Sequence, residues 1–305
     1  MKYNSVLDAI GNTPLIRLNK LVPKDSADVY VKFESLNVGG SIKTRTAYEM
    51  IKKAIESGLI KDDTTIVEAT SGNQGIGLSL VAAALGYKAL IVLPDSVSNE
   101  RQKLIKQYGA DIRLVHDHGD IGACIAECKE IAEDLGKKDG YYLPGQFDNF
   151  ANIEAQRKTG LEILNDLPKV DGFCSGIGTG GTISGIGRVL KEKNPDILIW
   201  AIEPENAAIL SGKKVGSHLQ MGIGDGLIPN ILDQNIYNDV VIISDEEAID
   251  MAKQLARKEG ILAGITSGTN VAIALKMAKK LGKGKVVVTI LPDTGERYYS
   301  TPLFD

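Results

Sequence analysis

Short apolar runs separated by amphipathic segments constrain the fold of this 305-residue chain more than any other feature. Most of the runs do not alternate apolar with polar residues, and strands of that kind lie buried on both faces, as in a parallel sheet covered by helices. We expect strands at 28–34, 65–69, 88–93, 112–115, 170–174, 197–203, 240–243 and 285–291. We expect helices at 45–58, 74–86, 98–108, 121–135, 150–165, 181–193, 246–259 and 268–281. The fold class that this rhythm predicts is α/β.

The strands and helices fall into two series that meet near residue 147. They predict two domains, 1–147 and 148–305, each with a mainly parallel twisted sheet flanked by helices. The length agrees with this division, because a domain commonly has roughly 150 residues.

Composition excludes several classes of protein. The net charge of -4 provides no positive surface for nucleic acid or anionic lipid. No apolar run approaches the roughly 18 residues of a membrane-spanning helix, and the first residues lack the pattern of a signal peptide, so we expect a cytoplasmic protein. The three cysteines and three histidines lack metal-ligand spacing, and we expect no metal site. Any catalysis must then rely on lysine, hydroxyl groups, carboxylates or a bound cofactor.

Ligands of such folds bind beyond the carboxyl ends of the strands, in the loops that lead into helices. The loop at 37–43 contains two glycines and places Lys43 in the first turn of a helix, with Ser41 as the expected N-cap. A positive charge there opposes the helix dipole. A Schiff base with an aldehyde cofactor would account for Lys43, and a solvated lysine is the alternative.

Two further loops combine hydroxyl and amide side chains at the start of an expected helix. The loop at 70–75 can bind a carboxylate or phosphate, or can be a capped turn. The loop at 264–269 can present hydroxyl groups to a heterocycle nitrogen, or can cap its helix.

The loop at 176–182 is the richest in glycine. Its glycines would let a phosphate approach the backbone, and its threonines would add hydroxyl donors. Gly176, Gly178 and Gly181 also match G-x-G-x-x-G, with Glu203 at the end of the next strand, so a nicotinamide-dependent dehydrogenase is an alternative. A purely structural turn is another.

Together the loops suggest a ligand with an anionic end, a lysine that reacts with an aldehyde, and a separate substrate that carries a carboxylate. Six motifs occur in this order: NTPL at 12–15, GGSIK at 39–43, TSGNQGIG at 70–77, GTGGT at 178–182, GIGDG at 222–226 and LPDTGERYYSTPLF at 291–304. With these motifs nearly the whole chain resembles the cysteine synthase (O-acetylserine sulfhydrylase) family. These are pyridoxal-phosphate enzymes of fold type II, similar to the β subunit of tryptophan synthase.

The resemblance implies roles for residues around pyridoxal 5′-phosphate. Lys43 would carry the cofactor as a Schiff base and move the substrate Cα proton. Asn73 would bind the 3′ oxygen, and Thr266, where the family usually has Ser, would face the pyridine nitrogen. The phosphate would be held by Gly178, Thr179, Gly180, Gly181 and Thr182.

The resemblance also implies the substrate site. Thr70, Ser71 and Gln146 match the residues that bind the substrate carboxylate, and Gln74 replaces the usual Thr in that loop. Asp225 replaces the usual Ala of GIGAG beside the active site, and we expect it to take part in catalysis.

The implied reaction is β-replacement through an α-aminoacrylate intermediate, in the family's usual form from O-acetylserine and sulfide to cysteine and acetate. The Asp225 carboxylate would repel HS⁻ and favour a neutral thiol or water. The alternative is therefore L-cysteine as donor, with release of hydrogen sulfide and formation of lanthionine or serine.

The resemblance further implies a homodimer whose partners are small amino-acid substrates. The smaller N-terminal domain would be mobile, and part of 13–34 would cross to the other domain. A serine acetyltransferase C-terminal tail is a possible protein partner.

Overall fold

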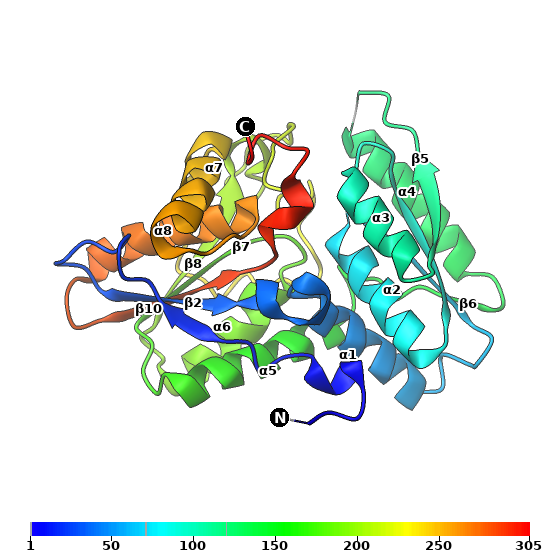
Figure 1. Ribbon diagram of the computed structural model, residues 1–305, viewed down its shortest axis with the longest axis horizontal. Coiled ribbons are helices and arrows are strands. Elements are labelled where there is room, and N and C mark those ends of the chain that lie inside the picture. Colours follow the sequence, from blue (N-terminus) through cyan, green and yellow to red (C-terminus); the bar gives the residue numbers. More distant parts are fainter. Residues whose placement is uncertain (1, 71, 120) are drawn as a thin grey trace.

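The expected strands assemble into two separate sheets in a computed structural model that describes residues 2–70, 72–119 and 121–305 (Figure 1). The larger sheet has the order β1 (Leu15–Arg17), β2 (Asp28–Phe33), β10 (Val286–Leu291), β7 (Gly172–Gly176), β8 (Leu198–Pro204) and β9 (Asp239–Ile243). The smaller sheet has the order β5 (Asp111–Val115), β4 (Lys88–Pro94), β3 (Thr65–Ala69) and β6 (Tyr141–Tyr142). All pairs are parallel except that of the edge strand β1 with β2. The predicted α/β class is confirmed.

Helices cover both faces of the larger sheet, which explains why its strands lack alternation. On β10, Val287 packs in the cluster formed with α7 (Asp245–Gln254) and α8 (Ile265–Leu281). The next residue, Val288, packs in the cluster formed with α5 (Ala151–Asp166) and α6 (Gly181–Lys193). Consecutive residues of the strand therefore both belong to a core.

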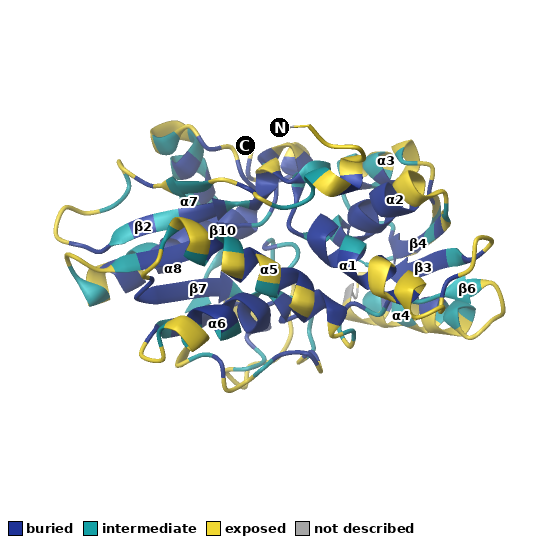
Figure 2. Ribbon diagram, turned by 90° about the horizontal axis from the view of Figure 1, so that it is seen from below, coloured by how far each residue is buried: buried dark blue, intermediate teal, exposed yellow. Residues whose placement is uncertain are grey.

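The smaller sheet is built in the same way. On β3, Ile66 packs with α1 (Lys43–Glu56), α2 (Asn73–Leu85) and α3 (Asn99–Gln107). The next residue, Val67, packs with α4 (Ile121–Gly136) on the opposite face. Figure 2 shows the inner strands β7 and β10 of the larger sheet and β3 and β4 of the smaller sheet mostly in the colour of buried residues, whereas the edge strand β6 has the colour of intermediate burial.

The helices and strands predicted from the sequence are present, and nearly all of their ends agree within three residues. The largest difference lies at 246–259, where α7 ends at Gln254 and continues as a π-helical turn, Leu255–Glu259. The strands β1 and β6 were not expected, because three and two residues are too few to show a pattern. Short 3₁₀ helices lie at Val6–Ala9, Glu34–Leu36, Val38–Gly40, Glu205–Ala207 and Gly295–Tyr298.

The two halves of the chain are connected through the region of β1, β2 and α1. The strands β1 and β2 belong to the larger sheet although they precede the smaller one in sequence, and α1 contacts both α2 and α5. The boundary between residues 147 and 148, and the mobility of the smaller domain, stay predictions.

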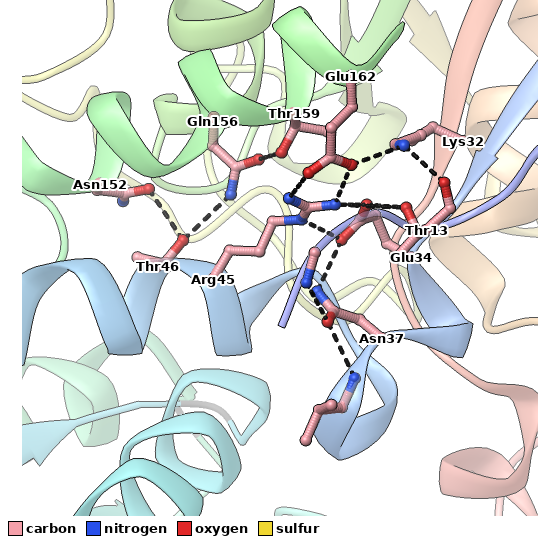
Figure 3. A network of polar contacts seen from close by, with 12 residues as sticks. Thr13, Lys32, Glu34, Asn37, Arg45, Thr46, Asn152, Gln156, Thr159 and Glu162 are labelled. Carbon is pink, nitrogen blue, oxygen red and sulfur yellow. Dashed lines mark hydrogen bonds and ion pairs between the residues drawn. The ribbon is translucent and has the colours of Figure 1, made fainter. Parts of the chain in front are cut away.

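A buried ionic network fixes the start of α1 against β2 and α5 (Figure 3). The Arg45 guanidinium donates to Glu34 and, from Nη1, to Glu162 at 2.6 Å, and Lys32 Nζ lies 2.7 Å from Glu162. Burial opposes ionisation of Glu162, but the two cations outweigh it and lower its pKa to about 2. This network orients the helical turn that carries Lys43.

Within the described residues, no helix is both long enough and apolar enough to span a membrane.

Candidate active site

A cavity of about 1080 Å³, counting its opening to solvent, lies where the carboxyl ends of strands from both sheets meet. Its walls include most of the residues that the sequence singled out: Lys43, Thr70, Asn73, Gln74, Gln146, Gly178, Thr179, Gly180, Thr182, Asp225 and Thr266. Gly181 begins α6 behind this wall, and a Cβ there would lie 2.2 Å from Asn152 Oδ1. Ser71 lies outside the described residues.

Lys43 is the first residue of α1, and its Nζ lies 3.4 Å from Thr179 Oγ1. Burial lowers the pKa of Lys43 to about 8, although the carboxylates of Asp225 and Glu68 oppose this shift. A sizeable fraction of this amine is thus uncharged near neutral pH, which is the form that attacks an aldehyde.

The prediction that Ser41 is the N-cap of this helix is wrong. Ile42, and not Ser41, occupies the N-cap position of α1, and none of the described side chains caps the helix. Ser41 forms an isolated antiparallel bridge with Asp293, and this pairing aligns the GGSIK loop with the loop after β10.

The loop between β7 and α6 has the geometry of an anion site. Gly178, Thr179 and Gly180 donate no backbone N–H to a described residue, and they precede the N-terminus of α6. A Cβ on Gly178 would lie 2.4 Å from the Gly222 carbonyl oxygen, so only glycine allows this close approach. Helix N-termini with free N–H groups bind phosphate readily.

Asn73 and Thr266 lie on other walls of the cavity, each held by a hydrogen bond. Asn73 Nδ2 donates to Asp293 at 2.7 Å, and Asn73 Oδ1 accepts from Arg297 at 2.6 Å, so the amide orientation is fixed. Thr266 Oγ1 donates to the Met221 carbonyl at 3.1 Å. A ligand nitrogen that faces Thr266 would meet a neutral hydroxyl group there.

The loop that leads into α2 lines another part of the cavity. Gln74 is buried, and neither its Oε1 nor its Nε2 has a partner among the described residues, which leaves both atoms for a ligand. Thr70 Oγ1 accepts from Gly72 N at 3.1 Å. Gln146 is also buried at the cavity wall.

Asp225 lies in the cavity wall and is half-buried. It makes no hydrogen bond or ion pair with any described residue. Burial raises the pKa of Asp225, and the positive charges of Lys43 and Lys129 oppose that rise. Nearby Glu68 accepts from Gly145 N at 3.0 Å, and burial raises its pKa to about 8.

Several residues at the site were not found from the sequence. Asp293 and Arg297 lie within the LPDTGERYYSTPLF motif, which had been noted only as a family signature. Arg101 of α3 lines the cavity, is 2% exposed and stacks 4.8 Å from the ring centroid of Tyr298. Its helical pattern gave no sign that a cation would face inward.

The alternative of a nicotinamide-dependent dehydrogenase does not fit Glu203. One of its carboxylate oxygens accepts from Leu210 N at 2.7 Å, and the other accepts from Ser211 N and Oγ. This carboxylate orders the 205–211 segment, and it is not available for a nucleotide ribose.

The family model of pyridoxal-phosphate dependent enzymes matches residues 6–293, and the chain belongs to this family. Lys43, the loop at 178–182 and the hydroxyl group of Thr266 are the groups that such a cofactor requires.

Within this family the chain is similar to cysteine synthase of Staphylococcus aureus, with 46% identity over 99% of this chain and 97% of the relative. The solved structure of O-ureido-L-serine synthase has a TM-score of 0.94 at 42% identity, covering 100% of this chain and 96% of that one. The hydrogen sulfide-producing enzyme Fn1220 of Fusobacterium nucleatum has a TM-score of 0.90 at 40% identity, covering 97% of this chain and 100% of that one. The protein is thus a pyridoxal-phosphate dependent β-replacement enzyme that works through an α-aminoacrylate.

Proposed function

We propose that this enzyme uses L-cysteine as donor, releases hydrogen sulfide, and transfers the remaining three-carbon unit to the thiol of a second cysteine or to water. The products are then lanthionine or serine. The observation that carries the proposal is the Asp225 carboxylate, which lines the cavity without a partner among the described residues.

The residues of the cavity fit the cofactor. The loop 178–182 would hold the phosphate, Asn73 the 3′ oxygen and Thr266 the ring nitrogen, while Lys43 would bond to the aldehyde carbon. When bound, pyridoxal phosphate supplies an electron sink for the bond broken at Cα. Because the Thr266 hydroxyl is neutral, it would not hold the ring nitrogen protonated, and the bound cofactor would then favour loss of a β substituent.

The chain's own groups would then bind the donor and move protons. Thr70, Gln74 and Gln146 would hold the carboxylate of the donor, and the unpartnered amide of Gln74 supports this role. Lys43 would take the Cα proton and later return it, because its pKa of about 8 suits both steps near neutral pH.

Asp225 would select the acceptor. Two like charges about 4 Å apart repel by on the order of 4 kcal/mol at an effective dielectric of about 20, so a carboxylate near the reacting carbon disfavours HS⁻. The same carboxylate can accept the proton of a neutral thiol or water as that nucleophile adds. The similarity to a hydrogen sulfide-producing enzyme is in keeping with this direction.

Cysteine synthesis from O-acetylserine and sulfide is the second candidate, and the 46% identity to a cysteine synthase favours it. Mass spectrometry of the products separates the two. We expect hydrogen sulfide with lanthionine or serine from cysteine alone. Formation of product only from O-acetylserine plus sulfide would contradict the proposal and favour the second candidate.

We further propose that the enzyme acts in the cytoplasm as a homodimer, as its resemblance to the family implies. Light scattering of the purified holoenzyme tests the dimer. Binding of a serine acetyltransferase C-terminal tail stays a prediction, to be tested by titration with that peptide.

A further inference from the structure

Lys129 is a cation of the cavity wall that the proposed chemistry does not use. It lies on α4, and its Nζ is 4.4 Å from the ring centroid of Phe147. Lys129 makes no hydrogen bond or ion pair with any part of the chain that the structure describes. Its neighbours along the helix in the cavity wall, Ile125 and Cys128, carry no charge.

The same cavity holds an anion without a partner. Asp225 follows the GIG turn at 222–224 in the C-terminal half, whereas Lys129 belongs to the smaller sheet's helix layer. Both side chains line the cavity, and the positive charge of Lys129 opposes the rise in pKa that burial causes at Asp225 and at Glu68. Opposite charges thus face one cavity without forming an ion pair, which leaves each available to a ligand.

Lys129 adjoins only one part of the site proposed for the donor carboxylate. Thr70 and Gln74 of that site lie at the start of α2, and α2 and α4 cover opposite faces of the smaller sheet. Its third residue, Gln146, precedes Phe147, the ring that Lys129 contacts. Both helices reach the cavity, α2 through Asn73 and Gln74 and α4 through Ile125, Cys128 and Lys129. Groups that can bind a carboxylate therefore reach the cavity from both helices.

We propose that Lys129 and Asp225 form the binding site of the second substrate, an amino-acid thiol, with Lys129 binding its α-carboxylate and Asp225 its α-ammonium group. This inference deepens the proposed function and rests on it, because it names the class of acceptor for the same cavity. An acceptor held at both charged ends is fixed in orientation, so that its thiol can be directed at the reacting carbon. HS⁻ and water have neither an α-carboxylate nor an α-ammonium group. The site therefore favours an amino-acid thiol over both of them.

The ratio of lanthionine to serine formed from cysteine by the holoenzyme tests the role of Lys129. Water has no carboxylate, so the serine branch is an internal reference for the same donor step. We expect Lys129→Gln to lower this ratio about 10- to 100-fold, as for loss of a charge-assisted hydrogen bond, with hydrogen sulfide release from the donor retained. The matched control is Lys137→Gln, which removes the same charge from an exposed residue just beyond α4 and should leave the ratio unchanged.

Truncated acceptors test each charge by itself. Cysteamine keeps the ammonium group and lacks the carboxylate, so Lys129→Gln should not weaken its use. 3-Mercaptopropionate keeps the carboxylate and lacks the ammonium group, so Lys129→Gln should weaken its use as it does for cysteine.

Three results would overturn the inference. They are an unchanged lanthionine-to-serine ratio in Lys129→Gln, an equal loss with cysteamine and 3-mercaptopropionate, and a wild-type enzyme that forms serine without lanthionine. None of these affects the proposed donor. If cysteine alone gives no hydrogen sulfide, the proposed donor is wrong, and the same comparison with O-acetylserine as donor and cysteine as acceptor still decides on Lys129.

Discussion

The lowered pKa of Lys43 predicts how the apoenzyme takes up its cofactor as pH changes. Schiff-base formation needs the uncharged amine, and a lysine of ordinary pKa, 10.5, is only about 0.1% uncharged at a pH of about 7.5. With a pKa of about 8, about a quarter of Lys43 is uncharged at that pH, roughly 200-fold more. The rate of covalent attachment should therefore rise with pH up to about 8 and then level off.

Substitution of the nearby carboxylate should move this profile in a defined direction. Asp225 raises the pKa of Lys43, since a negative charge stabilises the ammonium form. In Asp225→Asn the pKa of Lys43 falls further, and the profile should level off at lower pH. Glu68 titrates in the same range, and Glu68→Gln, which removes the other carboxylate, should shift the profile in the same direction.

The assay mixes apoenzyme with pyridoxal phosphate at a series of pH values, stops each sample with borohydride and quantifies the labelled peptide that contains Lys43. Lys43→Ala is the control for non-specific labelling. A wild-type profile that keeps rising toward a pH of about 10 would refute the reasoning, because Lys43 would then titrate as an ordinary lysine.

Three further substitutions test the cavity wall and a residue that supports it. Asn152→Ala should lower the free energy of unfolding of the apoenzyme by about 2–4 kcal/mol, because Asn152 donates to Thr179 Oγ1 and to the Gln146 carbonyl and accepts from Thr46 Oγ1. Urea denaturation measures this free energy, and an unchanged midpoint would contradict the prediction. Gly178→Ala should weaken cofactor binding about 10-fold or more, because the new Cβ would lie 2.4 Å from the Gly222 carbonyl oxygen, while the circular dichroism spectrum stays unchanged. Equilibrium dialysis measures the affinity, and wild-type affinity would mean that this loop does not hold the phosphate. Thr266→Asp should slow β-elimination in stopped-flow spectroscopy by holding the ring nitrogen protonated, and unchanged kinetics would mean that Thr266 does not face that nitrogen.

Most of the secondary structure could be predicted, because strands buried on both faces and helices with one apolar face leave clear patterns. The run at 65–69 coincides with β3, and 181–193 coincides with α6. The sheet order could not be predicted in this way. The strand β2 pairs with β10, more than 250 residues later, and periodicity within a segment contains no information about such a partner.

The candidate site could be predicted where a loop motif contains the chemistry. Lys43 and the loop at 178–182 were found because glycines and hydroxyls after a strand are unusual enough to notice. Arg101 and Lys129 were missed, because a basic residue on an amphipathic helix ordinarily faces solvent. Asn152 was missed for another reason: its three hydrogen bonds join α1, the 146 loop and Thr179, which only the fold brings together. Figure 3 shows the bond with Thr46 of α1.

The proposal that Asp225 directs this enzyme to cysteine is tested most directly by a ratio of two kcat/KM values. The first value is measured with cysteine as sole substrate, and the second with O-acetylserine plus sulfide, in wild type and in Asp225→Ala. We predict that the substitution lowers the ratio of the first to the second, because HS⁻ is no longer repelled and the neutral thiol loses its base. A ratio that Asp225→Ala leaves unchanged would contradict the account and make ordinary cysteine synthesis the better assignment.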